Sequence, residues 1–122
     1  MPVEDCTVKE LDCPGGLLVV LCPPGASLLD HPRVRAEKFT SIAPGSLSMG
    51  YEDDWSRGYY VYASPRGGGF YLEGSLDAFD DPSCGAQVVP EVVGYLASRG
   101  LVDSGGAAML EAILYRRVFR AQ

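Results

Sequence analysis

The sole histidine and one of four cysteines are the residues of this sequence best suited to covalent chemistry. His31 and Cys84 lie 53 positions apart, a separation compatible with a cysteine–histidine dyad. A nucleophilic thiol also needs a nearby base and donors for the oxyanion. His31 stands in Asp-His-Pro-Arg, and Cys84 stands in a loop that we expect between two helices. We therefore expect no catalytic residue, and a small cysteine hydrolase using Cys22 or Cys84 with His31 remains an alternative.

The cysteines also bear on metal binding and on location. Cys6, Cys13, Cys22 and Cys84 are separated by 7, 9 and 62 positions, whereas zinc ligands usually include a pair two to four residues apart. We predict no metal site and no cofactor. The N-terminal residues lack the basic start of a secretory signal, so we expect a cytoplasmic protein with reduced thiols. Two disulfides are the alternative.

Two further motifs favour ordinary loops. The segment 66–69, Arg-Gly-Gly-Gly, lacks the Lys-Ser/Thr ending of a phosphate-binding loop and the spacing of a dinucleotide site. The carboxylates at 52–54 and 77–81 lack the alternating pattern of a calcium loop. We expect a turn in the first case and solvated charge in the second.

Composition narrows the class of protein. The chain has 122 residues, which fit a single globular domain over 1–122, and its net charge is −6. Proteins that bind nucleic acids gain affinity from basic residues, so the acidic charge argues against such a partner. The longest apolar run has six residues, far short of the roughly 18 that span a bilayer, and we expect no membrane partner.

The elements that would position these residues follow from apolar patterning. Breakers flank the apolar run Leu17–Cys22, which predicts a strand buried on both faces. We also expect strands at 47–51 and 59–63, helical turns at 33–39, a short amphipathic helix at 70–79, and a helix at 88–96 with Pro90 in its first turn and Gly100 as its cap. Residues 107–119 favour a helix, but 113–119 could equally form a terminal strand. This pattern predicts an α/β fold, a small sheet with two or three flanking helices.

Tyrosines concentrate in one predicted strand. Strand alternation places Tyr60 and Tyr62 on the same face, opposite Tyr59 and Val61. One face belongs to the core, and the other is either core or a recognition surface, because tyrosine combines contact area with a polar tip.

Residues 58–76, Gly-Tyr-Tyr-Val-Tyr-Ala-Ser-Pro-Arg-Gly-Gly-Gly-Phe-Tyr-Leu-Glu-Gly-Ser-Leu, resemble the small subunit of caspases. In that family a Gly-Tyr-Tyr segment leads through a Pro/Gly turn into a Gly-Ser motif and a helix. Val89–Leu96 is similar to the next helix of that subunit, and Ile113–Phe119 is similar to its final strand. The resemblance implies a caspase-small-subunit-like sheet with flanking helices.

The departures from the family pattern imply a truncated relative without catalysis. Ala63 replaces the arginine that receives the substrate's aspartate, and Pro23 takes the place of the nucleophile, with Cys22 one position early. Only 16 residues precede the first expected strand, so the part that carries the catalytic histidine is missing.

The resemblance implies a regulator that binds a protein partner, a protease being one candidate, in a homodimer or heterodimer. The final strand of the caspase small subunit pairs across a two-fold axis. The expected partner-binding residues are Tyr60, Tyr62, Ile113, Leu114, Tyr115, Arg116, Arg117, Val118 and Phe119. An acidic inhibitor or immunity-type binding protein is the other non-catalytic alternative.

Overall fold

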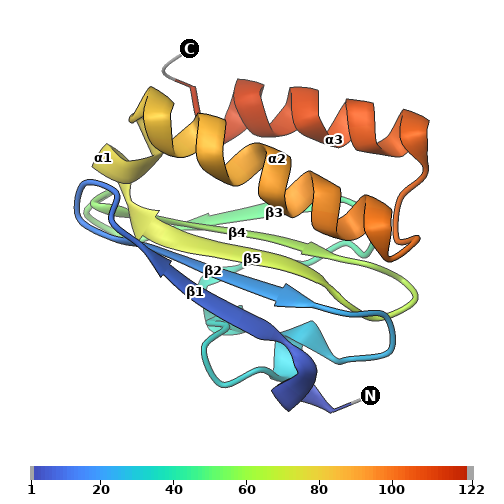
Figure 1. Cartoon of the computed structure of the whole chain (residues 1–122). Coiled ribbons are helices and arrows are strands. Elements are labelled where there is room, and N and C mark those ends of the chain that lie inside the picture. The colour runs from blue at the N-terminus through green and yellow to red at the C-terminus, as the bar shows by residue number, and fades with distance from the viewer. Residues whose placement is uncertain (1, 121–122) are drawn as a thin grey trace.

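The computed structural model describes residues 2–120 and shows a five-stranded antiparallel sheet followed by three helices (Figure 1). The strands are β1 (Thr7–Leu11), β2 (Leu17–Cys22), β3 (Leu47–Tyr51), β4 (Arg57–Ala63) and β5 (Gly69–Ser75). Their order across the sheet is β1-β2-β5-β4-β3, so β1 and β3 are the two edges. The predicted α/β class, a small sheet with flanking helices, is confirmed.

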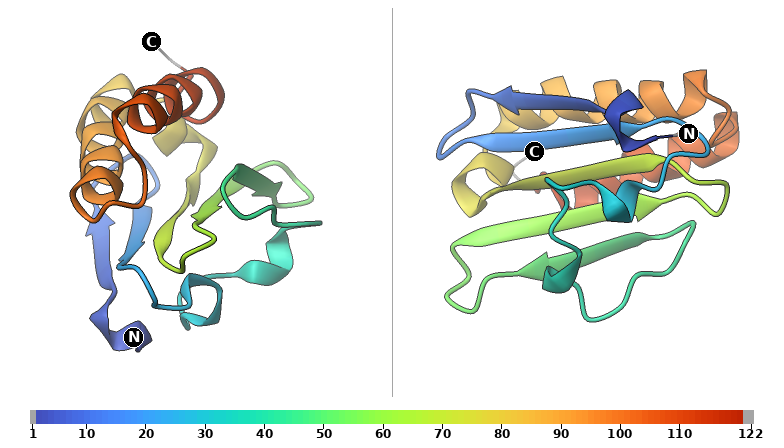
Figure 2. Two further views of the ribbon diagram at one scale, coloured as in Figure 1. Left: turned by 90° about the vertical axis from the view of Figure 1, so that its right-hand side faces the viewer. Right: turned by 90° about the horizontal axis from the view of Figure 1, so that it is seen from below.

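All three helices lie on one face of the sheet, as Figures 1 and 2 show. They are α1 (Leu76–Phe79), α2 (Pro82–Ser98) and α3 (Ser104–Arg117). Each helix starts at a side-chain cap: Ser75, Asp81 and Asp103 accept hydrogen bonds from the main-chain N–H groups three residues later. Gly100, with a φ of 70°, follows the end of α2 as predicted. Within residues 2–120, no helix is long and apolar enough to cross a membrane.

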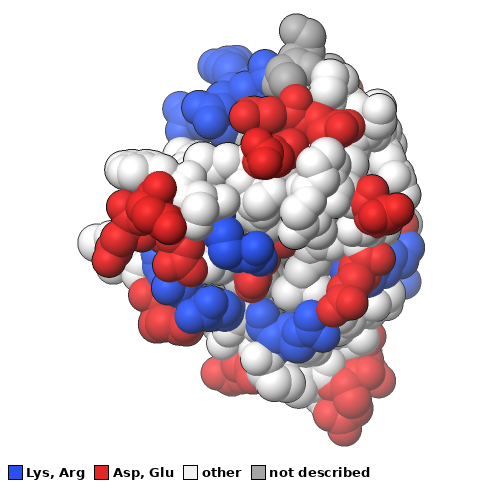
Figure 3. Space-filling view, turned by 90° about the vertical axis from the view of Figure 1, so that its left-hand side faces the viewer, with Lys and Arg blue, Asp and Glu red and all other residues white. Residues whose placement is uncertain are grey.

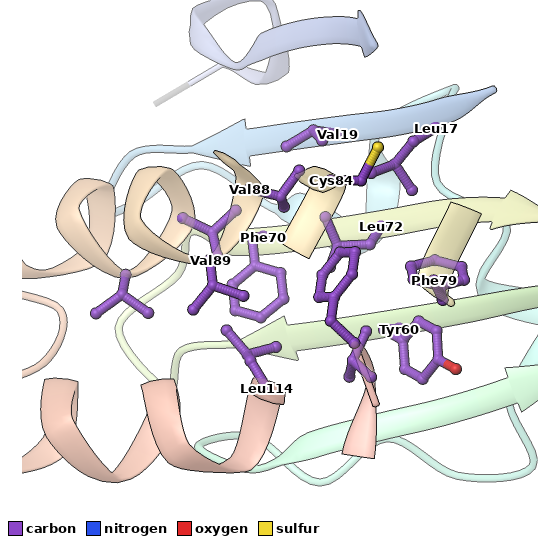
Figure 4. Close-up of a cluster of buried hydrophobic side chains, with 14 of the residues drawn as sticks. Leu17, Val19, Tyr60, Phe70, Leu72, Phe79, Cys84, Val88, Val89 and Leu114 are labelled. Atoms are coloured by element: carbon purple, nitrogen blue, oxygen red, sulfur yellow. The ribbon is translucent and has the colours of Figure 1, made fainter. Parts of the chain in front are cut away.

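The opposite face is covered by the segment 23–46, which contains the short 3-10 turns η2 (Leu28–Asp30) and η3 (Ala36–Lys38) (Figure 2). The sheet therefore carries a core on each face. The helix-side core, drawn in Figure 4, includes Leu17, Val19, Tyr60, Phe70, Leu72, Phe79, Val88, Val89 and Leu114. The opposite core includes Leu18, Val20, Leu28, Val34, Phe39, Tyr59, Val61 and Tyr71. β2 is buried at every position, as predicted, because both of its faces are covered.

Two predicted helical features are wrong. The segment 70–79 is mostly the strand β5, and only its last four residues are helical. β5 lies in the middle of the sheet and is buried on both faces, so its apolar residues are consecutive rather than alternating. Pro90 lies in the interior of α2, not in the first turn, because that helix already begins at Pro82.

The alternative of a terminal strand at 113–119 is also wrong. α3 continues as a helix to Arg117, after the side chain of Asp103 caps its first turn. Its sequence between the cap and Arg117 contains the strong helix formers Ala107, Ala108 and Leu110. The C-terminal pairing strand that the caspase resemblance implied is therefore absent from residues 2–120.

The cysteines form two disulfides, which corrects the expectation of reduced thiols. Cys6 bonds Cys22, and Cys13 bonds Cys84, so no cysteine of the described chain is free. The first bridge crosses the hairpin of β1 and β2, where the two cysteines lie opposite each other at adjoining strand ends. The second links residues 71 positions apart. The spacing of the cysteines in the sequence does not predict either disulfide, because only the folded chain brings the two members of each pair together.

Candidate interaction surface

The cysteine–histidine dyad does not form. His31 belongs to the segment that covers one face of the sheet, whereas Cys84 lies in the core on the helix side and is bonded to Cys13. The other candidate nucleophile, Cys22, is bonded to Cys6. Neither Cys22 nor Cys84 therefore has a free thiol that could act as a nucleophile. Within residues 2–120, no group of three histidine, cysteine or acidic side chains is placed to hold a metal ion.

His31 instead has a local structural contact. Its Nδ1 accepts a hydrogen bond from the main-chain N–H of Arg33 at 3.0 Å. Burial lowers the pKa of the imidazole, and the nearby positive charge of Arg33 lowers it further. Both effects favour the neutral ring, which is the form that accepts this hydrogen bond.

Four of the predicted partner-binding residues are core residues, which corrects that part of the prediction. Tyr60, Leu114, Val118 and Phe119 are completely buried. The Tyr60 ring lies edge-on to Phe79, with centroids 4.8 Å apart. Because 113–117 is helical, the side chain of Leu114 points onto the sheet instead of lining a free edge.

The remaining predicted residues lie at or near the surface. Arg116 and Arg117 are exposed, and Tyr62, Ile113 and Tyr115 are half-buried. Tyr62, Ile113 and Arg117 meet in a groove of about 400 Å³ between α3 and the start of β3. The other lining residues are Gly45, Ser46, Leu47, Val102, Gly106, Met109 and Leu110.

Exposed apolar side chains also lie in β3, whose first residue lines this groove, and in the turn after it; Met49 and Trp55 line a second hollow there. Large hydrophobic residues are exposed at four positions of the described chain: Val8 (39%), Met49 (38%), Trp55 (64%) and Met109 (68%). Met109 lines the groove, Met49 lies in β3, and Trp55 follows β3 in the next turn. We call the set Leu47, Met49, Tyr51, Trp55, Met109 and Ile113 the α3–β3 surface. Sequence reasoning missed Leu47, Met49, Tyr51, Trp55 and Met109.

An aromatic contact ties Trp55 to the rest of this surface. The Trp55 ring lies 5.2 Å from the ring of Tyr51, and Tyr51 is in edge-on contact with the buried Tyr60. The hydroxyl groups of Tyr51 and Tyr60 are hydrogen-bonded at 3.3 Å. Trp55 also has a φ of 61°, which is uncommon for a bulky side chain. The exposed indole therefore packs against the ring of Tyr51 at the edge of the sheet.

The two edges of the sheet differ in charge. β1 carries Lys9 and Glu10, and both are ion-paired: Lys9 with Glu91, and Glu10 with Arg33 at 2.7 Å. The sequence of β3, Leu-Ser-Met-Gly-Tyr, contains no charge. Proteins commonly protect edge strands with charged residues, because unpaired main-chain groups attract other strands. Only β1 has this protection.

The main chain of β3 presents unpaired groups outward at alternate residues. The Glu52 N–H donates to the Arg57 carbonyl at 3.1 Å, which fixes the alternation in the antiparallel pair β3–β4. Leu47, Met49 and Tyr51 therefore direct their N–H and C=O groups away from β4. The side chains of these three residues face the helix side of the sheet, and those of Ser48 and Gly50 face the opposite side.

Charges of both signs border the α3–β3 surface. Arg116 and Arg117 occupy the last turn of α3, and Glu52, Asp53 and Asp54 lie in the turn after β3. Figure 3 shows basic and acidic groups lying next to one another at several places on this end of the molecule. Hydrogen bonds from the Tyr59 hydroxyl and the Lys38 ammonium lower the pKa of Glu52, so its carboxylate is anchored as an anion.

Tyrosines also form a polar network on the face away from the helices. The Tyr71 hydroxyl donates to Glu73 at 2.6 Å, and Arg57 donates to the other oxygen of Glu73 at 3.0 Å. Burial raises the pKa of Tyr71, with the hydrogen bond to Glu73 adding to the effect. The Arg57–Glu73 bond joins β4 to β5, and both residues also line a hollow of about 400 Å³ beside β2.

No family model, no curated protein and no solved structure matches this chain. The fold defines the class, an antiparallel sheet with helices on one face, and the resemblance to the caspase small subunit stays a prediction.

Proposed function

We propose that this chain is a non-catalytic interaction protein that binds a protein partner through the α3–β3 surface. The observation that carries the proposal is the coincidence, on one side of the molecule, of three exposed large apolar side chains and an uncharged sheet edge. Contiguous exposed apolar surface on a soluble domain is typical of an interaction site.

As expected from the sequence, the proposed partner is a protein, but the contact is made by β3 and the groove beside it instead of a C-terminal strand. An added strand at a free edge gains affinity from main-chain hydrogen bonds, and neighbouring pockets give specificity. The edge β3 and the groove beside Met109 supply both features. A protease remains one candidate partner, and no cofactor takes part in this mode of binding.

The disulfides bear on where the protein acts. Structural disulfides persist in oxidising compartments and are rare in the cytosol. The bonds Cys6–Cys22 and Cys13–Cys84 therefore favour an oxidising compartment over the cytoplasmic location that we expected from the N-terminal sequence.

The proposal is tested by titrating purified candidate proteases onto the immobilised chain. Binding by the wild type should be lost in Met109→Glu, which places a charge in the groove, and retained in Val8→Glu. Val8 is a matched control because it is an exposed apolar residue at the other edge of the sheet. Equal binding by both variants would contradict the proposed surface.

Salt dependence separates this proposal from an acidic inhibitor or immunity-type protein. The net charge of −6 is the feature that favours the acidic binder. Association that slows steeply with added salt would support electrostatic docking through acidic groups. Association that is nearly insensitive to salt would support an apolar and main-chain contact.

A further inference from the structure

We propose that the strand added to the β3 edge is β3 of a second copy of this chain, so that two sheets join across a two-fold axis at Met49. The inference rests on the proposed function and names its partner. Three features support it: the outward main-chain groups of β3, the sizes of its alternating side chains, and the distribution of charge along α3.

The main-chain pattern of β3 suits antiparallel pairing with itself. Leu47, Met49 and Tyr51 present their N–H and C=O groups outward, and Met49 is the middle residue of the strand. A two-fold axis at Met49 pairs it with the partner's Met49 and pairs Leu47 with the partner's Tyr51. Every residue with outward groups then has a hydrogen-bonding counterpart.

Limited space on the face of β3 away from the helices restricts the side chains that an added strand can place there. Gly50 packs so closely on the main-chain carbonyl of Lys38 that a Cβ at this position would collide with it. The neighbouring Ser48 accepts a hydrogen bond from the Ala43 N–H. Because space on this face is limited, an added strand fits best when the residues that it places there are small. β3 itself meets the requirement, since its own Gly50 would lie opposite Ser48.

On the helix side of the sheet there is room for large side chains, and β3 carries large side chains on that face. There the groove beside Met109 and Ile113 is open, and the side chains of Leu47 and Tyr51 are half-buried. Pairing β3 with β3 places leucine against tyrosine and methionine against methionine on this face. The alternation of large apolar and small residues, which a partner strand would need, is present in β3.

The charges of α3 agree with a two-fold arrangement. Asp103 caps the start of α3, and Arg116 and Arg117 lie in its last turn; Figure 1 shows that α3 and β3 run in the same direction. A two-fold axis at Met49 makes the two α3 helices antiparallel. Arg116 and Arg117 of each helix then lie toward the end of the other helix that carries Asp103, and this pairing of opposite charges favours association.

Sedimentation of the purified, oxidised chain over a range of concentrations tests the inference. The molar mass of the wild type should rise from 13.1 kDa toward twice that value as concentration increases. Met49→Lys and Met49→Pro should each raise the dimer dissociation constant by about tenfold or more. Proline removes an N–H that points away from β4, so the ladder inside the sheet is retained.

Val8→Lys and Val8→Pro are the matched controls. Val8 is exposed to nearly the same extent as Met49, and its register places its N–H outward at the other edge of the sheet. These variants should dimerise as the wild type does. A wild type that stays at 13.1 kDa at every concentration would overturn the inference, as would equal weakening by the two sets of variants.

A cysteine at the axis gives a second measurement that does not depend on a destabilising change. All native cysteines are paired, so Met49→Cys introduces the one free thiol of the described chain. Facing residues of an antiparallel pair lie within disulfide range, and Met49→Cys should cross-link to its own copy faster than Val8→Cys. Equal cross-linking rates would count against the two-fold pairing. A monomeric wild type whose protease binding is lost in Met109→Glu would refute the dimer and leave the proposed function standing.

Discussion

Cys13 and Cys84 join the turn between β1 and β2 to the first turn of α2, so one covalent bond holds the helix layer against the sheet. The other bridge, between Cys6 and Cys22, spans 16 positions within a single hairpin. The longer bridge therefore constrains the unfolded chain more than the shorter one does.

Removing the longer bridge should destabilise the protein more than removing the shorter one. Chain-entropy estimates give about 4 kcal/mol for a loop of this length and about 3 kcal/mol for the shorter loop. The measurement is denaturant unfolding of the double variants Cys13→Ala/Cys84→Ala and Cys6→Ala/Cys22→Ala. A larger loss in the second variant would show that the helix layer does not depend on the covalent link.

Leu114 and Met109 lie on the same helix, and truncating their side chains should change the stability of the protein to very different extents. Leu114 is completely buried over the sheet, so Leu114→Ala should reduce the free energy of unfolding by about 2–5 kcal/mol. Met109→Ala should change it by no more than about 0.5 kcal/mol, because that side chain is mostly exposed. Comparable losses at both positions, measured by urea denaturation, would contradict the orientation of α3.

Gly94 and Gly69 form a second contrasting pair. Gly94 lies on the exposed side of α2 with open space around its Cβ position, so Gly94→Ala should stabilise the protein by about 0.5–1 kcal/mol. Gly69 has a φ of 133°, and a Cβ there would collide with the Tyr62 carbonyl. Gly69→Ala should therefore lower the melting temperature, whereas Gly94→Ala should raise it. Melting curves that shift the same way would refute this account.

His31 should make stability depend on pH in the weakly acidic range. Its pKa in the folded protein is lower than the usual 6.5, so below pH 6.5 the unfolded chain binds the proton more readily. The contribution of the neutral ring is fully present above pH 6.5 and declines as the pH falls toward the folded pKa.

His31→Asn isolates this contribution, because asparagine keeps an acceptor for the Arg33 N–H but does not titrate. The free energy of unfolding of both proteins is measured by chemical denaturation at several pH values between about 7.5 and 5, the range in which histidine titrates. The wild type should lose more stability across this range than the variant. Parallel pH profiles would show that His31 has the same pKa in the folded and unfolded chain.

The sequence alone predicted elements whose apolar pattern is compatible with one kind of secondary structure only. Leu17–Cys22 was predictable because a fully apolar run between glycines and prolines has one common interpretation, a strand covered on both sides. The same burial made β5 misleading, since the consecutive apolar residues at its start and the later Leu76 and Phe79 mimic a helical spacing. Local sequence does not reveal which strands lie in the middle of a sheet.

The α3–β3 surface was not predictable for a different reason. Met49, Trp55 and Met109 have the same residue types as core positions, and only the fold leaves them exposed. The residue type of Tyr60 predicts a recognition surface, yet Tyr60 is completely buried in the folded protein. Exposure of an apolar side chain depends on which elements cover it, and that information is spread over the whole chain.

The order of the elements along the chain has a consequence for biosynthesis. All five strands precede residue 76, and the three α-helices follow. A nascent chain therefore completes its sheet while the apolar face that α2 and α3 will cover is still bare. During that interval the apolar face of the sheet is exposed, and exposed apolar surface of this kind makes a partly folded chain prone to aggregation.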